Sequence, residues 1–394
     1  MMNDLRFEWI KAKKSNVFIL FISACFILTL VFFGVQSSQQ SLLYEEHSLL
    51  LNREVSNLET DNQLLRESNE ELKHDDMIEN ADEIIRFHEE NIAFNNHLIP
   101  FARATADAFD EGNYEVYYIS RMRFLKESAR ANEFIDYSHI VVGEIDEGLQ
   151  ESDQHEFDIL SAFLSAGEPM ENEQVSLTAP NHIVLLARLF MNPFVLIILV
   201  LLISLVLVEE VSEDSLTLQL TETEKPVYWF FSNRLFSFSL FIFGLLTSFM
   251  LSFALLNLFG RPLFDTAPSW RAPIVLNDYV HNQLTILTYF ILIMVILIVA
   301  FLFLHQLFTV ILLYVKKVML SVIVFFTISL LGFFFTQAYQ TLLHWSNPFA
   351  LFFINEWLAS NQLNELILGL GITCIMSGLL FTVAARKLKH SPLS

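Results

Sequence analysis

The chain has 394 residues, of which 54% are hydrophobic, 17% are charged and 39 are phenylalanine. A soluble protein of this length would carry about a quarter charged residues, so this composition, with a mean hydropathy of +0.47, excludes an ordinary soluble protein with a single core. No basic stripe is present to neutralise phosphates, which argues against nucleic-acid binding. The two cysteines, Cys25 and Cys374, both lie in apolar blocks, so neither a disulfide nor a cysteine-based metal site is expected.

Six apolar blocks are long enough to cross hydrocarbon, which takes about 20 residues as a helix. The first, residues 16–35, follows a basic start and has no A-x-A-like cleavage site, which favours an uncleaved anchor over a signal peptide. The fourth and fifth blocks are hard to separate, because His305-Gln306 and Lys316-Lys317 both interrupt the apolar run. The five later blocks cover residues 183–208, 236–259, 284–304, 308–335 and 366–384.

The segment between the first two blocks holds the acidity of the chain. Residues 36–182 contain 32 acidic and 9 basic residues, a balance of −23. Lys and Arg concentrate instead near the other ends of the spans, and such residues favour the cytoplasmic face. With six spans, both termini are therefore expected to be cytoplasmic and the acidic domain extracellular.

The acidic domain begins with a strongly helical stretch that repeats every seven residues. One seam carries Leu51, Leu58, Leu65 and Leu72, and the other is mostly polar, with Ser48, Val55, Asn62 and Asn69. This pattern is typical of a weak coiled coil. Leu50 and Leu64 widen the stripe, which favours packing on other helices of the same domain, and pairing between subunits is the alternative. Later apolar stripes at helical spacing predict that the rest of the domain is mainly helical.

No catalytic constellation is present. The chain lacks a G-x-x-x-x-G-K-[ST] sequence, so it has no P-loop for ATP, and it lacks a G-x-S-x-G elbow. His88-Glu89-Glu90 resembles the opening of a zinc-protease motif, but Ile92 stands where the second ligand belongs. His88 and His97 among carboxylates form either a cation site or, more simply, a solvated acidic face. We expect neither enzymatic activity nor a cofactor.

Two spans carry small residues at every fourth position. These are Gly244, Ser248 and Ser252 in the third span, and Gly369, Thr373 and Ser377 in the sixth. Small residues at this spacing allow close helix contact. They serve either packing within the chain, or a subunit interface or translocation path. Because charged residues are nearly absent from the spans, a proton- or ion-coupled carrier is disfavoured.

Three segments carry a resemblance to a known family. The second span is followed by Glu209-Glu210-Val211-Ser212-Glu213-Asp214-Ser215-Leu216-Thr217-Leu218-Gln219-Leu220-Thr221 and then Pro226. This resembles the cytosolic coupling segment of ABC-2-type ABC transporter permeases, although Asp214-Ser215 stands where Gly-Thr is usual. Glu8, Trp9 and Lys11 are similar to the family's interfacial helix. Asn347-Pro348-Phe349 is similar to its outer re-entrant region.

The resemblance implies an all-α polytopic membrane protein with six transmembrane helices and a mostly helical extracellular domain between the first and second. It implies coupling to an ATPase through Glu209, Glu210, Glu213, Asp214, Leu216, Leu218 and Leu220; a solvated acidic loop is the alternative for this segment. The expected segments are an interfacial helix (1–15), a first span (16–35), the extracellular domain (36–182), a second span (183–208), the coupling segment (209–235), spans three to six with outer loops (236–386) and a cytosolic tail (387–394).

The function that follows is the permease subunit of an ATP-driven exporter in a bacterial plasma membrane. Its expected partners are two cytosolic ATPase chains, a second permease chain of the same or a related kind, membrane lipid and an amphipathic or hydrophobic substrate, such as a peptide or antibiotic. The alternative is a membrane-anchored receptor or scaffold whose extracellular domain binds a ligand and whose spans only signal.

The topology makes a direct prediction. Single cysteines at Ser68 and Ser152, in a chain whose native cysteines are replaced, should react with an impermeant thiol reagent in intact cells, because the acidic domain is expected outside. Labelling that requires lysis of the cells would overturn this topology.

Overall fold

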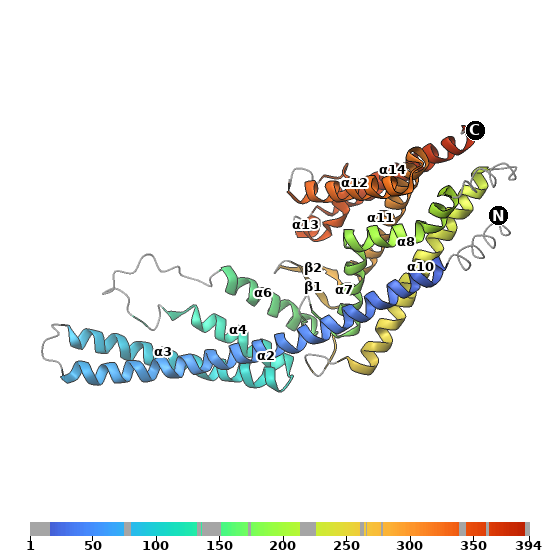
Figure 1. The fold of residues 1–394 in the computed structure, drawn as a ribbon. Helices are drawn as coiled ribbons and strands as arrows, with labels where there is room; N and C mark the ends of the chain where they lie inside the picture. Colours follow the sequence, from blue (N-terminus) through green and yellow to red (C-terminus); the bar gives the residue numbers. More distant parts are fainter. Residues whose placement is uncertain are drawn as a thin grey trace. The chain divides into compact units, whose positions relative to one another are not determined.

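The structure is a computed structural model that describes residues 16–74, 80–131, 135, 151–171, 175–212, 226–260, 264, 266–276, 279–338, 344–359 and 362–390. These residues are predominantly helical, with one small two-stranded sheet (Figure 1). The chain divides into two compact units. We call one the apolar unit (Met1–Val35, His182–Phe259 and Thr288–Ser394) and the other the acidic unit (Gln36–Asn181 and Gly260–Leu287).

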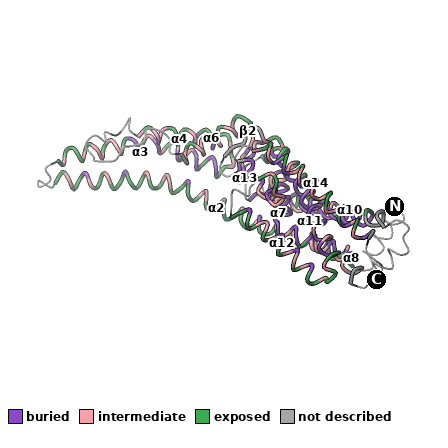
Figure 2. Tube along the Cα trace, turned by 90° about the horizontal axis from the view of Figure 1, so that it is seen from above, coloured by how far each residue is buried: buried purple, intermediate pink, exposed green. Residues whose placement is uncertain are grey.

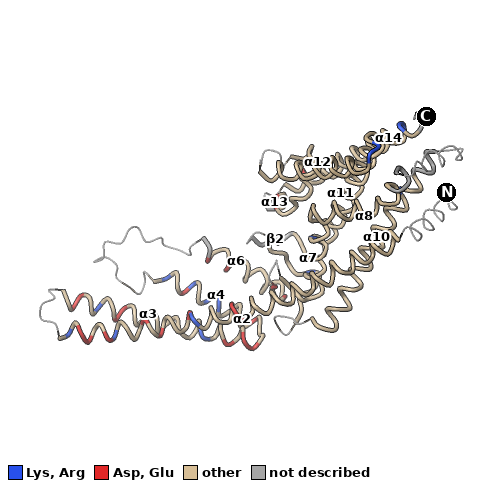
Figure 3. The backbone as a smooth tube through the Cα atoms, viewed as in Figure 1, with Lys and Arg blue, Asp and Glu red and all other residues tan. Residues whose placement is uncertain are grey.

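Within the described residues, five helices are long and apolar enough to cross a membrane, or six spans result if one bent helix pair counts as a span. The five helices are α2 (Val17–His74), α10 (Pro226–Phe259), α11 (Ile286–Val315), α12 (Val318–Ala338) and α14 (Leu363–His390). The bent pair is α7 (Ala179–Met191) and α8 (Pro193–Ser212), which meet at 68°. Charged residues are sparse on these apolar helices and dense on α3 and the acidic part of α2 (Figure 3). The composition and helix lengths are compatible with a multi-pass membrane protein.

The break between α7 and α8 has a local cause at Asn192-Pro193. Proline fixes its own φ and cannot donate a backbone hydrogen bond, so it is tolerated at the first position of a helix but not inside one. The Asn192 side chain caps the new helix, because its Oδ1 accepts a hydrogen bond from the Phe194 amide at 3.0 Å. The predicted span 183–208 is therefore two helices with a sharp turn.

Of the two possible breaks between the fourth and fifth spans, the structure has the one at Lys316-Lys317, so the predicted bounds 284–304 and 308–335 were wrong. Helix α11 runs through His305-Gln306 and ends at Val315, and α12 begins at Val318. Lys316 adopts a left-handed conformation, φ 57°, which breaks the helix at the lysine pair. His305 is instead a buried residue of α11: its ring stacks on Phe301 at 5.4 Å between centroids.

Helix α11 supplies much of the core of the apolar unit. Its apolar side chains that are at most 1% exposed include Ile293, Ile296, Leu297, Phe301, Leu304, Phe308 and Leu312. Figure 2 shows buried residues gathered on α7 and α11, whereas α12 and α14 carry exposed stretches. Phe301 also stacks on Phe241 of α10 at 4.0 Å, so aromatic contacts join α10 and α11.

The acidic unit is built on an antiparallel pair of long helices. After the distal part of α2 come α3 (Ala81–Asp110), α4 (Tyr114–Ser128) and α6 (Glu151–Ala166). The sheet consists of β1 (Pro273–Leu276) and β2 (Tyr279–Thr285), paired antiparallel with an irregularity between Pro273 and Ile274. No sequence pattern indicated that residues 260–287 belong to this unit, since 260–283 were expected to be an outer loop and 284–287 the start of a span.

The heptad seam of α2 packs within the chain: Leu51 is 4% exposed, and polar seam residues bond side chains of α3. The side chain of Asn62 donates to Asn96 at 3.1 Å, and Asn69 Oδ1 lies 2.7 Å from His88 Nδ1. At the opposite end Ser48 donates to Asp110 at 2.7 Å. The expectation that Leu50 and Leu64 also pack inside the domain was wrong, because these side chains are 53% and 57% exposed.

Close packing of α10 on α2 makes a testable prediction. A Cβ added to Gly244 would overlap the ring of Phe21, with Cζ at 2.8 Å, and this ring is itself 1% exposed and has no room to move. Gly244→Leu should therefore destabilise the protein by about 1–3 kcal/mol through overpacking. The measurement is the thermal unfolding midpoint in detergent. Gly371→Leu in α14 is the control, because no heavy atom lies within 4 Å of the position that a Cβ would take there; equal midpoints for both variants would contradict the packing argument.

Candidate functional site

The residues expected to couple to an ATPase lie almost entirely outside the described residues. Glu209 and Glu210 fall in the last turns of α8, and their side chains are not described. Glu213, Asp214, Leu216, Leu218 and Leu220 lie outside the described residues, as do Glu8, Trp9 and Lys11 of the expected interfacial helix. The structure does extend α10 back to Pro226, so residues 226–235 of the expected coupling segment form the start of a helix.

The two stripes of small residues pack against different neighbours in the apolar unit. In α10, Gly244 faces Phe21 and Cys25 of α2, and Ser248 and Ser252 are 1% and 0% exposed. In α14, a Cβ added to Gly369 would lie 3.4 Å from the Trp345 carbonyl oxygen, and buried Thr373 donates to the Gly369 carbonyl at 2.8 Å. Ser377 is half-buried. The described contacts of Gly244 and Gly369 are contacts within the chain.

Asn347-Pro348-Phe349 begins a short helical element between α12 and α14. The element consists of a 3-10 helix, η3 (Pro348–Phe352), and α13 (Ile354–Ala359). Asn347 accepts a hydrogen bond from the Phe349 amide at 3.1 Å and donates to Thr336 of α12 at 2.7 Å. The Phe349 ring lies directly on Gly332, where an added Cβ would be 2.8 Å from Cζ of the ring. Polar and close apolar contacts thus fix the element to α12.

The second half of this element is also anchored inside the apolar unit. Trp357 is 1% exposed, and its indole N–H donates to the Ala350 carbonyl at 2.9 Å. The Tyr289 hydroxyl of α11 donates to Asn355 at 2.5 Å. Irregular backbone inside a membrane protein is stable only where protein or water forms hydrogen bonds with its polar groups. For this element, residues of the same chain form such bonds.

A buried polar pair joins α10 and α11. Arg234 Nη1 lies 2.7 Å from Nδ1 of His305, and the two residues are 7% and 2% exposed. Arg234 is one of the basic residues near the span ends, just before the predicted third span at 236–259. Neither segment alone carries a sequence pattern that predicts the pairing of Arg234 with His305, which is 71 positions away.

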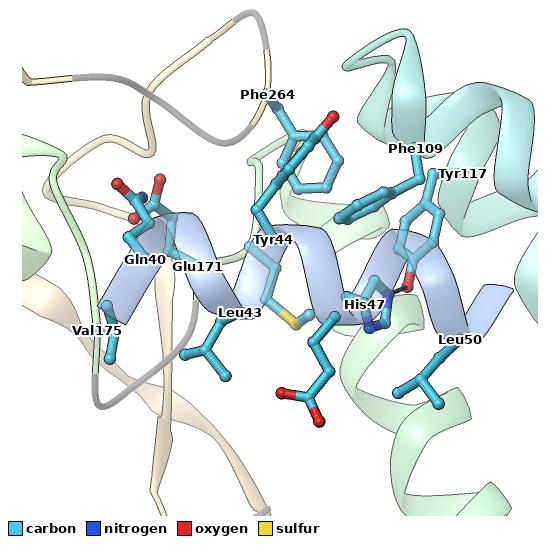
Figure 4. A pocket seen from close by; sticks show the side chains of 12 residues that line it. Gln40, Leu43, Tyr44, His47, Leu50, Phe109, Tyr117, Glu171, Val175 and Phe264 are labelled. Atoms are coloured by element: carbon cyan, nitrogen blue, oxygen red, sulfur yellow. Dashed lines mark hydrogen bonds between the residues drawn. The ribbon is translucent and has the colours of Figure 1, made fainter. Parts of the chain in front are cut away.

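The acidic unit contains a cavity of about 300 Å³. Its lining comes from α2, α3, α4, the chain after α6 and the segment before β1 (Figure 4). Tyr44 of α2 stacks on Phe109 of α3 with ring centroids 5.1 Å apart. The described lining residues are Gln40, Leu43, Tyr44, Glu46, His47, Leu50, Phe109, Tyr117, Met170, Glu171, Val175 and Phe264.

Two groups of polar side chains lie at opposite ends of the cavity (Figure 4). At one end His47 Nε2 lies 3.0 Å from the Tyr117 hydroxyl. Burial, and then the nearby charge of Arg121, lower the pKa of His47, so its ring is neutral at pH 7. At the other end are Gln40 and Glu171; Glu171 is 8% exposed and accepts a hydrogen bond from the Ser176 hydroxyl.

Next to this cavity, Arg121 of α4 joins two other helices. Its Nη1 donates to Glu54 of α2 at 2.7 Å, and its Nε and Nη2 donate to the two carboxylate oxygens of Glu156 of α6 at 2.8 and 3.2 Å. Burial alone would lower the pKa of Arg121, but the hydrogen bonds and charges of Glu156 and Glu54 outweigh it and raise the pKa. The guanidinium is therefore permanently charged and is shared by two carboxylates.

The described histidines among carboxylates do not assemble a metal site. His88 pairs with Asn69, and His97 Nε2 lies 3.1 Å from Glu127. Among the residues that the structure describes, no group of three or more His, Cys, Asp or Glu side chains is arranged to hold a metal ion. Comparison with known proteins gives no significant match to any family model, curated protein or solved structure.

The Arg121 network makes a prediction about stability and pH. Arg121→Met leaves Glu54 and Glu156 without their cation, which should destabilise the acidic unit by about 2–3 kcal/mol at pH 7, since the carboxylates are partly buried. Burial already raises the pKa of Glu54. Without Arg121 that pKa rises further, so protonation rescues the variant and its deficit shrinks as the pH falls from about 7 toward about 5.

The readout is the temperature at which protease cleaves the acidic unit of the full chain, compared with the parent protein at each pH. Arg103→Met is the matched control. Arg103 pairs with Glu59 at 2.5 Å, but the two side chains are 57% and 49% exposed, so its loss should cost less than about 0.5 kcal/mol. Equal losses for both variants would show that the Arg121 network does not hold the helices together.

Proposed function

We propose that this chain is the membrane-spanning subunit of an ATP-driven ABC exporter that moves an amphipathic or hydrophobic substrate. The chain itself contains no P-loop sequence, so ATP hydrolysis takes place on two separate cytosolic ATPase subunits. A second permease chain completes the pathway. Both termini lie in the cytoplasm, and the acidic unit lies outside the plasma membrane.

The observation that carries the proposal is the short element η3–α13 between α12 and α14. An apolar, non-spanning segment is expected at this place from the resemblance to ABC-2-type permeases, and Asn347 begins it. A membrane anchor for a receptor needs only enough helices to hold its outer domain. Holding an outer domain in the membrane does not require a buried helical element with its own capping residue and buried tryptophan. Such an element fits a unit that forms one wall of a transport pathway.

The order of the apolar helices gives further support. The large acidic segment follows the first span, and a long leucine-containing acidic segment follows the second. The ATPase must transmit the free energy of ATP hydrolysis to this chain through a protein interface on the cytosolic side. The chain therefore needs a cytosolic element that the ATPase binds. Leu216 and Leu220 fall one helical turn apart, as expected for a helix that enters a groove on a partner, and neighbouring glutamates would set its register.

A membrane-anchored receptor or scaffold is the second candidate, because the acidic unit contains a cavity that a ligand can enter. The two functions differ in energy coupling. A receptor shows no ATPase activity that depends on residues 209–221, whereas an exporter subunit does.

The test is a double substitution in the coupling segment. Leu216→Asp with Leu220→Asp should lower substrate-stimulated ATPase activity of the assembled complex by at least about tenfold, since two buried contacts at the interface centre are lost. Membrane insertion should be unchanged. The matched control is Leu42→Asp with Leu49→Asp in the acidic unit, where the side chains are 63% and 57% exposed, and this control should retain coupling. Survival of both assembly and ATPase stimulation in the first variant would reject the exporter function.

A further inference from the structure

The floor of the cavity in the acidic unit is made of aromatic rings from separate parts of the chain. Phe109, Tyr117 and Phe264 are each 3% exposed. The ring centroids of Phe109 and Tyr117 are 5.5 Å apart, and Phe264 lies 6.0 Å from Tyr117. Tyr44 continues this set toward solvent, where it is half-buried. The faces of aromatic rings carry negative electrostatic potential, so such a set attracts positive charge.

The charged groups of the cavity have the same sign. Glu171 is buried beside Gln40 at one end (Figure 4), and Glu46 is exposed at the rim. Among the described residues that line the cavity, none is lysine or arginine. Glu171 accepts a hydrogen bond from the Ser176 hydroxyl and, as a carboxylate, has several acceptor positions.

The nearest guanidinium, that of Arg121, does not make the charge around the cavity positive. Arg121 is bound by the carboxylates of both Glu54 and Glu156, so this cluster carries a net negative charge. Partial burial and the nearby charge of Arg121 lower the pKa of His47, which disfavours the positively charged form of its ring. The charged side chains that line the cavity are therefore acidic, and the neighbouring cluster adds no net positive charge.

The size and rim of the cavity limit the ligand. A volume of about 300 Å³ is at the small end of ligand pockets and holds one ring or a compact branched group. The side chains of Leu43 and Leu50, which lie along α2 in Figure 4, are 39% and 53% exposed. They offer apolar contact to the part of a ligand that leaves the aromatic floor.

We propose that this cavity is a binding site for a small organic cation with an apolar body, such as a substituted ammonium ion. The positive group lies against the half-exposed ring of Tyr44, which stacks on Phe109 at the aromatic floor, and is balanced by Glu171. The apolar body contacts the exposed leucines at the rim. This site assignment goes beyond the exporter function and does not depend on it, because a receptor would use the same cavity.

Two other occupants are disfavoured by the same observations. An anion would meet carboxylates at the end and rim of the cavity without a cation in the described lining. A neutral aromatic molecule would make the apolar contacts but would have no charge–charge attraction to Glu171. A lipid-like chain exceeds the volume, although its head group would share the chemistry of the proposed ligand.

The experiment is a calorimetric titration of the full chain in a nonionic detergent with benzyltrimethylammonium, which combines one ring with a quaternary cation. We expect a dissociation constant of about 0.1–1 mM for a ligand of this size. N,N-dimethylbenzamide, which is neutral and of similar size, should bind at least about fivefold more weakly, since it lacks the cation–π contact. Equal binding of the two molecules, or no binding of the cation, would overturn the proposal.

Variants locate the site. Tyr44→Leu removes a half-exposed ring face and should weaken cation binding about fivefold to tenfold, and Glu171→Gln should weaken it about tenfold through loss of charge. Tyr114→Leu is the matched control: Tyr114 belongs to the same aromatic cluster but bonds the Gly167 carbonyl outside the cavity lining. The thermal midpoint of each variant shows whether it has folded. If Tyr114→Leu weakens binding as much as Tyr44→Leu, or if folded Tyr44→Leu and Glu171→Gln bind as the parent does, the cation does not occupy this cavity.

Discussion

The acidic unit depends on the guanidinium of Arg121, which joins glutamates of α2 and α6 to α4. Three helices from distant parts of the chain meet at one cation, and the planar fork of arginine makes three hydrogen bonds that lysine cannot reproduce. The same contact positions Tyr117 and His47, since Tyr117 lies one turn before Arg121 on α4 and is hydrogen-bonded to His47 of α2. The ion cluster and the aromatic floor of the cavity are therefore parts of one arrangement.

The apolar unit is governed by a different constraint, which is that backbone polar groups in hydrocarbon must be satisfied within the protein. Long helices meet this requirement in α10, α11 and α12. Where a helix begins, a side chain accepts a hydrogen bond from a backbone amide that has no partner within the helix. Asn192 caps α8 in this way after the bend, and Asn347 caps η3. Close approach of helices then relies on glycine, as at Gly244 beside Phe21 and Gly332 beneath Phe349. Helix packing within the chain therefore explains why small residues recur in the spans, and no role in a transport pathway is needed to explain them.

The sequence was informative where one segment determines its own structure. Apolar length predicted the candidate spans, and the seven-residue repeat predicted the face that α2 turns toward α3. Sequence reasoning failed where distant segments meet. His305-Gln306 resembles a turn until Arg234 and Phe301 are placed beside it, Leu50 and Leu64 resemble core residues until their exposure is known, and Phe264 resembles a loop residue until it completes the aromatic floor. The cavity was not predictable, because its lining comes from five separated segments.

The proposal that an external ATPase drives this chain is tested most directly by mass spectrometry of the intact complex. The complex is purified from its native membrane in nonionic detergent, and its subunits are identified by sequence and stoichiometry. The account predicts equal numbers of permease chains and P-loop ATPase chains, two of each, with ATP hydrolysis by the purified assembly. A chain that purifies alone, or with partners that lack a P-loop and hydrolyse no ATP, would contradict it.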